Sequence, residues 1–103
     1  MLFAFSVAPT ASDADDGSVS EAVAGAVRVV RESGLPNETT AMFTTIEGEW
    51  DEVMAVIKRA CEEVARFGPR VSLVLKADLR PGYDGQLSAK VERVEKHLDP
   101  GEG

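Results

Sequence analysis

Carboxylates and hydroxyls are concentrated in one short stretch of this sequence, Thr39–Glu49. The run Thr44-Thr45-Ile46 favours a pleated strand because β-branched residues pack well there. It ends in Glu47 and Glu49, two carboxylates separated by one glycine. Glu47 lies where the strand would end and a helix would begin, so its carboxylate can cap free backbone amides of that helix or face a ligand. The sequence leaves both roles open.

Three hydroxyl side chains could join Glu47 in a site. Thr44 and Thr45 are adjacent on a strand and must point to opposite faces, so at most one of them faces such a site. Which of the two does so stays open. Ser6 is the polar member of a small-residue face on the predicted strand 2–8, and that face would leave room above the sheet.

The clearest predicted strand, 70–80, carries three charges in a row. Its alternation places Lys76, Asp78 and Arg80 on the face opposite the apolar residues. A solvated face, or ion pairing with neighbouring strands, would explain such a row. We interpret the strand as internal to the sheet, where three charges on one face would also indicate a site or an oligomer contact.

Nucleophilic and metal-assisted catalysis have few candidate residues here. The chain has only one cysteine and one histidine, Cys61 and His97, so we expect no Ser-His-Asp, Cys-His or metal cluster. Cys61 lies on the apolar stripe of a predicted helix and is interpreted as a core residue. A hydrolase that pairs Glu47 with Asp78 remains an alternative, but we predict a protein that is not an enzyme.

The elements that position these residues follow from hydrophobic periodicity. We predict an α+β, ferredoxin-like βαββαβ sandwich with an added C-terminal helix, forming a single domain over residues 1–103. One sheet face would carry two helices, and the other would be wet or covered by another copy of the chain. The predicted elements are strand 2–8, a helix that begins at Ser18 and is stopped by Gly34, two strands joined by a bend at Ala41-Met42, helix 50–67, strand 70–80 and helix 83–98.

Charge and composition restrict the classes of binding partner. The net charge of −7 and the pI of about 4.6 disfavour nucleic acid and anionic membrane surfaces. A cationic or neutral small molecule is compatible with this charge, and so is solubility alone. The single cysteine fits a reducing compartment. Because Met1–Ala8 lacks the basic segment of a signal peptide, we predict a cytoplasmic location.

Several segments together resemble one known family. They are Ser6–Pro9, Glu32–Leu35, Thr44–Val53, Lys76–Arg80 and Lys90–Glu95, and they occur in the same order over nearly the whole chain. On these residues the chain resembles the thiamine-binding-like family of small ferredoxin-like proteins, formerly an uncharacterised protein family. Phe43 departs from the family pattern, in which a smaller or polar residue is common.

The resemblance implies a function and an assembly. It implies non-enzymatic binding of thiamine, or of its hydroxymethylpyrimidine moiety, by a carrier, buffer or sensor with no cofactor or metal. It also implies a homo-oligomer, either a homotetramer built as a dimer of dimers or a dimer. The alternative is an oligomeric interaction module that binds no small molecule.

The same resemblance, combined with the chemistry of the side chains, implies a ligand site. Glu47 would accept a hydrogen bond from the exocyclic amine of the aminopyrimidine, and Phe43 would stack on the ring. Hydroxyls would contact the remaining ring edge, and Asp78 is a second candidate carboxylate. The predicted ligand-binding residues are Ser6, Phe43, Thr44, Thr45, Glu47 and Asp78.

Overall fold

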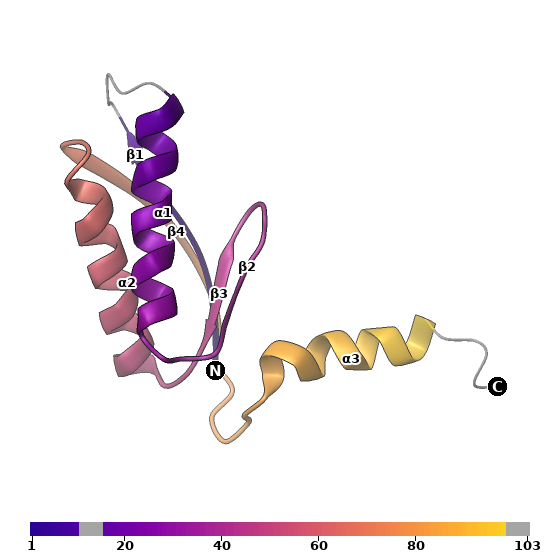
Figure 1. Cartoon of the computed structure of the whole chain (residues 1–103). Helices are drawn as coiled ribbons and strands as arrows, with labels where there is room; N and C mark the ends of the chain where they lie inside the picture. Colours follow the sequence, from indigo (N-terminus) through magenta and orange to yellow (C-terminus); the bar gives the residue numbers. More distant parts are fainter. Residues whose placement is uncertain (11–15, 99–103) are drawn as a thin grey trace.

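Four antiparallel strands form one sheet in the order β2-β3-β1-β4 (Figure 1). The computed structural model describes the backbone of residues 1–10 and 16–98, and the side chains of residues 1–10 and 19–98. The order of elements confirms the predicted ferredoxin-like pattern with an added C-terminal helix. The strands are β1 (Leu2–Thr10), β2 (Asn37–Thr39), β3 (Thr44–Glu47) and β4 (Arg70–Asp78). The helices are α1 (Asp16–Glu32), α2 (Trp50–Ala65) and α3 (Gln86–Leu98).

The core lies between one sheet face and the helices α1 and α2. Strand β1 is central, and its alternation buries every second side chain beneath these helices. Trp50 at the start of α2 packs edge-on against Phe3, with ring centroids 5.7 Å apart. Both helices contribute apolar stripes, so they cannot leave this face without exposing the core. The buried residues are Phe3, Phe5 and Val7 of β1, Ala22, Ala26 and Val30 of α1, Ile46 of β3, and Val53, Val56, Ile57, Ala60 and Val64 of α2.

The bend between β2 and β3 is a tight turn at Ala41-Met42, as predicted. The Thr40 N–H donates to the Phe43 carbonyl at 2.8 Å, and the Thr40 hydroxyl accepts from the Phe43 N–H at 3.3 Å. A threonine side chain therefore supports this turn, which lacks the usual Asn-Gly pair. The register then aligns Thr39 with Thr44 and Asn37 with Ile46.

The prediction that the last strand is internal is wrong. β4 lies at the edge of the sheet and pairs with β1 along its full length, from Leu2 opposite Asp78 to Thr10 opposite Arg70. Because β1 is flanked by β3 and β4, the last strand is left at the edge. Charges are common on edge strands, since they discourage pairing with other chains. β4 ends at Asp78 and not at residue 80, so it carries Lys76 and Asp78 but not Arg80. These charges therefore do not by themselves indicate a site.

Three helix boundaries differ from the prediction. α1 begins at Asp16 rather than Ser18, and α2 ends at Ala65 rather than Phe67, which are shifts within the usual spread of helix ends. α3 begins at Gln86 rather than at residue 83, because the preceding turn contains two left-handed glycines. Gly82 has φ +85° and Gly85 has φ +68°.

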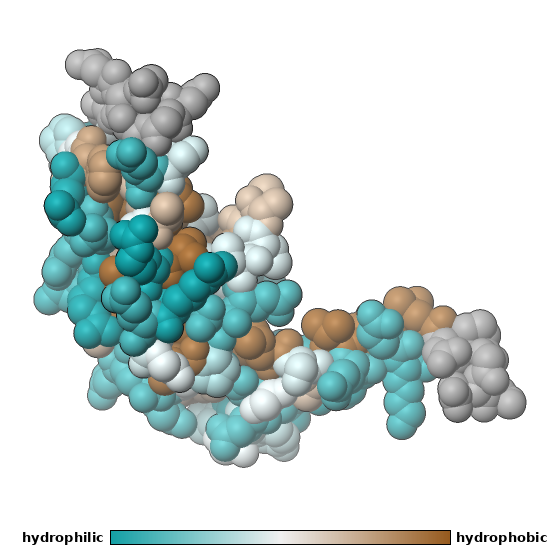
Figure 2. Space-filling view, in the orientation of Figure 1, coloured by the Kyte–Doolittle hydropathy of each residue, from teal (hydrophilic) through white to brown (hydrophobic). Residues whose placement is uncertain are grey.

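Helix α3 projects away from the rest of the molecule (Figure 1). The radius of gyration is 15.9 Å, larger than the roughly 13 Å expected for 100 compact residues. The predicted apolar stripe of α3 has the expected spacing but is not buried. Val91, Val94 and Leu98 are 55%, 59% and 71% exposed, and Figure 2 shows hydrophobic atoms along this helix. None of the helices in the described part of the chain has the length and apolar character required to cross a membrane.

Candidate functional site

Strand register decides which side chains share a face with Glu47. Glu47 lies opposite Leu2, and Thr45 lies opposite Ala4. Paired residues of an antiparallel sheet point to the same face, so Thr45 and Glu47 share the face opposite α1 and α2. Thr44 lies opposite Phe5 and is buried on the helix side. Thr45 is therefore the threonine that can face a site on the open side.

The carboxylate of Glu47 caps α3. Its Oε2 accepts a hydrogen bond from the Gln86 N–H at 2.9 Å, and its Oε1 accepts a longer one from the Leu87 N–H at 3.4 Å. These are backbone amides of the first turn, which have no partner within the helix. The Glu47 N–H donates to the Pro36 carbonyl at 2.9 Å. Glu47 is only 7% exposed, so it is fixed through both its backbone and its side chain.

The alternative role of Glu47, as the cap of the helix that follows it and was predicted over residues 50–67, is wrong. Glu49 is the N-cap residue of α2, and its N–H donates to Oε1 of Glu52 at 2.9 Å. Side-chain alternation explains the difference, because Glu47 points to the open face while α2 packs on the other. Glu47 therefore caps a helix, but not the helix that the sequence suggested.

Asp78 is the second anchor of α3. Its carboxylate forms a salt bridge with Lys90, one turn into the helix. The hydrogen bond and charge of Lys90 lower the pKa of Asp78 below its ordinary value, with smaller contributions from Arg80 and the N-terminal amine. Arg80 stacks on the Tyr83 ring at 3.6 Å from its centroid. Both candidate ligand carboxylates therefore hold the first turns of α3 at the end of the sheet, while the rest of the helix projects away.

Acid is expected to release α3 from Asp78. Because the folded pKa of Asp78 is lowered, the pair stabilises the docked helix above the unfolded pKa of about 3.9. This stability is lost as the pH falls through the folded pKa. Protection factors of the α3 amides, measured by hydrogen exchange, should fall more between pH 5 and pH 3 in the natural chain than in Lys90→Met. An equal fall in both proteins would contradict this.

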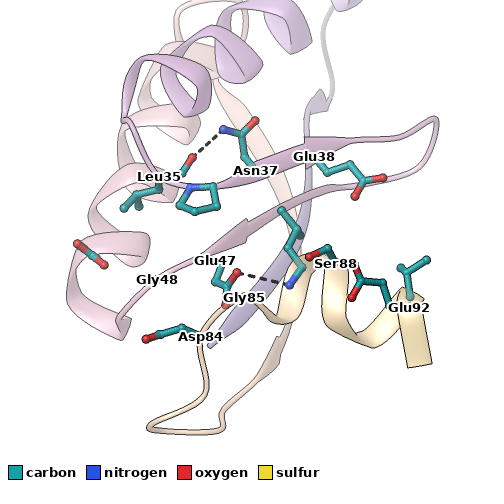
Figure 3. Close-up of a pocket in the computed structure, with 13 residues that line it drawn as sticks. Leu35, Asn37, Glu38, Glu47, Gly48, Asp84, Gly85, Ser88 and Glu92 are labelled. Carbon is teal, nitrogen blue, oxygen red and sulfur yellow. Dashed lines mark hydrogen bonds between the residues drawn. The ribbon is translucent and has the colours of Figure 1, made fainter. Parts of the chain in front are cut away.

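A groove of about 750 Å³ lies beside Glu47, within the usual 300–1,000 Å³ of small-molecule sites. It is bounded by the loop from α1 into β2, the end of β3, and the first half of α3 (Figure 3). Its apolar walls are Leu35, Pro36, Leu87 and Val91. Its carboxylates are Glu38, Glu47, Glu52, Asp84 and Glu92. The combination of apolar walls and acidic groups suits a flat, cationic ligand.

The other predicted site residues lie elsewhere. Ser6, Phe43 and Thr44 line a second pocket of about 210 Å³ between β1, α1 and the β2–β3 turn. Thr45 and Asp78 are absent from the residues that line the groove. Of the six predicted residues, the groove thus contains Glu47 only, and ligand binding by all six stays a prediction.

Sequence reasoning missed most of the groove. Its walls come from the Leu35–Glu38 segment, which precedes a three-residue strand, and from the helix that the sequence marked as an addition. One available signal was the apolar stripe that includes Leu87 and Val91, on a helix with no predicted packing partner.

Cys61 is half-buried against the core, as predicted, and burial together with Glu62 raises the pKa of its thiol.

Gly48 at the rim of the groove is required by close packing. A Cβ atom there would lie 2.9 Å from Cγ2 of Val53, which is fully buried, and 2.8 Å from Oε1 of Glu52. We therefore expect Gly48→Ala to destabilise the fold by about 1–3 kcal/mol and to lower Tm by at least about 4 °C. Calorimetry should show that Gly48→Ala lowers Tm by less in a Val53→Ala background than in the natural chain. Equal penalties in both backgrounds would refute the contact.

Comparisons with known proteins agree with this architecture. A family model described as thiamine-binding protein matches residues 3–95. A UPF0045 protein of Mycobacterium bovis is 54% identical over 99 residues, covering 95% of this chain and 94% of that protein. A domain of unknown function from Bacillus cereus has a similar structure, with a TM-score of 0.78 and 35% identity, covering 89% of this chain and 86% of that one. A candidate thiamine biosynthesis or salvage protein of Thermotoga maritima superposes with a TM-score of 0.73 at 25% identity, covering 89% and 97%.

Proposed function

The chain belongs to the family of thiamine-binding proteins, and from this membership we propose that it binds thiamine, or its hydroxymethylpyrimidine moiety, in the groove beside Glu47. The protein would act as a carrier, buffer or sensor and not as an enzyme. The family is named for binding and not for a reaction.

The buried carboxylate of Glu47 carries this proposal. A carboxylate offers about four lone-pair sites, and the α3 amides occupy two of them, one only through the 3.4 Å contact. The remaining sites can accept from the exocyclic amine of an aminopyrimidine, and more strongly if the ring is protonated. Capping and ligand binding are therefore compatible functions of one side chain.

The walls of the groove support a ring-shaped ligand. Leu35 and Pro36 on one side and Leu87 and Val91 on the other are apolar. Burial of apolar ring surface between such walls is favourable by about 25 cal/mol per Å². The thiazolium cation of thiamine would be attracted to the surrounding carboxylates. The described residues that line the groove include no lysine or arginine.

Calorimetric titration of the purified protein tests the proposal. We expect saturable binding of thiamine, and then of hydroxymethylpyrimidine, with a micromolar Kd, which corresponds to about −8 kcal/mol. Absence of binding heat for both compounds at two temperatures, in a protein with normal circular dichroism, would refute it.

The second candidate function is an oligomeric interaction module, and the exposed stripe of α3 favours it. Val91, Val94 and Leu98 form a continuous apolar face that the monomer leaves exposed. The occupant proposed for this face is another copy of the chain, in a dimer or in a tetramer built from dimers. Assembly and ligand binding are compatible, so the titration decides whether the module also binds a small molecule.

A further inference from the structure

We infer that the groove selects the unphosphorylated, cationic form of its ligand and discriminates against phosphate esters. The inference rests on the proposed function, because it specifies the ligand class of the same site. It follows from the charges of the residues that line the groove and from the carboxylates that already lie at the N-termini of α2 and α3 beside it.

The groove is acidic at both ends. Figure 3 shows Glu38 and Glu92 at one end, Asp84 at the other end, and Glu47 between them. Glu38 comes from β2 and Glu92 from α3, so the two carboxylates at this end of the groove belong to separate elements. A two-ring ligand can lie in the groove in either direction, and in both directions a phosphate at its end would approach a carboxylate.

The helix N-terminus that could attract a phosphate is already occupied. A free N-terminus binds anions through its backbone amides and its dipole. In α3 the carboxylate of Glu47 accepts from the Gln86 and Leu87 amides. A phosphate would have to displace a buried carboxylate from these donors.

The N-terminus of α2 is also acidic. Asp51 and Glu52 lie in its first turn, and Glu52 accepts from the Glu49 N–H at the edge of the groove. Neither helix therefore offers the positive end that phosphate sites use.

Nearby cations have other partners. Lys90 pairs with Asp78, and Arg93 donates to the Gln86 side chain at 3.0 Å. Neither residue lines the groove. Across residues 1–10 and 16–98, no three acidic, histidine or cysteine side chains converge as metal ligands. The carboxylates are thus spread around the groove, where they repel a phosphate. They do not converge on a site for a divalent cation, which could otherwise link the carboxylates to the phosphate.

Titration of thiamine, thiamine monophosphate and thiamine diphosphate tests this inference. A phosphate monoester adds about 1.5–2 negative charges at neutral pH, and a second phosphate adds further negative charge. At low ionic strength we expect the monophosphate to bind at least about tenfold more weakly than thiamine, which corresponds to 1.4 kcal/mol. The diphosphate should bind more weakly still, and the ratio should shrink at 0.15 M salt because the screening length falls to about 8 Å.

A double variant tests whether Glu38 and Glu92 cause the discrimination against phosphate esters. Glu38→Gln with Glu92→Gln should reduce the ratio of monophosphate Kd to thiamine Kd by at least threefold. The matched control, Glu21→Gln with Glu62→Gln, removes the same charge from exposed positions on α1 and α2 and should leave the ratio unchanged. Equal reductions in both variants would assign the effect to net charge and overturn the inference.

The outcomes separate the two proposals. Micromolar binding of thiamine together with esters that bind within threefold would overturn the inference and leave the proposed function standing. Tight binding of the diphosphate that requires added Mg²⁺ would also overturn it. Failure of all three compounds, and of hydroxymethylpyrimidine, to bind a folded protein would remove the proposed function, and the inference with it.

Discussion

Glu47→Gln is expected to raise the Kd for thiamine by more than tenfold and to loosen the start of α3, while the sheet with α1 and α2 stays folded. Hydrogen bonds to a charged group are worth about 1.5–3 kcal/mol, more than those to a neutral amide oxygen. The substitution also presents an NH₂ group to the N–H donors of Gln86 and Leu87 or to the ligand amine.

Two measurements separate the two roles of Glu47. Calorimetry reports ligand affinity, and hydrogen exchange at the Gln86 and Leu87 amides reports the cap. Glu62→Gln, at an exposed position on α2, is the matched control and should change neither. An unchanged Kd with normal circular dichroism would remove Glu47 from the ligand site, and unchanged exchange at Gln86 would contradict its role as the cap of α3.

A chain that ends before Gly82 is expected to keep the four-stranded sheet and lose its assembly. The truncation removes α3 with its exposed apolar stripe, whereas the core beneath α1 and α2 contains no residue of α3. Sedimentation velocity should show a shift to monomer, and circular dichroism should show the strands and remaining helices. Because the truncation also leaves Glu47 and Asp78 without their α3 partners, a second variant is needed.

Val94→Asp with Leu98→Asp tests the stripe in a chain of natural length. Both residues are exposed in the monomer, so the monomer should tolerate the change while an interface between copies should not. Glu95→Gln with Lys96→Gln, on other faces of the same helix, should leave the sedimentation coefficient unchanged. If the truncated chain and the aspartate variant both form an oligomer of the same size as the natural chain, α3 is excluded from the interface.

Local patterns in the sequence were sufficient to predict the fold. Alternation in β1 and β4 and the three-and-four spacing in the helices are properties of short segments, and each buried stripe of α1 and α2 is visible in the sequence. The bend at Ala41-Met42 also followed from segment length, and Thr40 supplies its support. The family resemblance came from the same segments, and the match over residues 3–95 agrees with it.

The partners of Glu47 were decided by the tertiary structure alone. The sequence by itself determined that this carboxylate ends a strand before a helix. Only the pairing of β3 with β1 and β2 decided that its side chain points to the open face, and only the turn at Gly82 and Gly85 brought the amides of α3 to it. The groove combines the loop before β2 with α3, about 50 residues apart in sequence. Periodicity describes which face a side chain occupies within its own element, but it contains no information about which distant element comes to lie against that face.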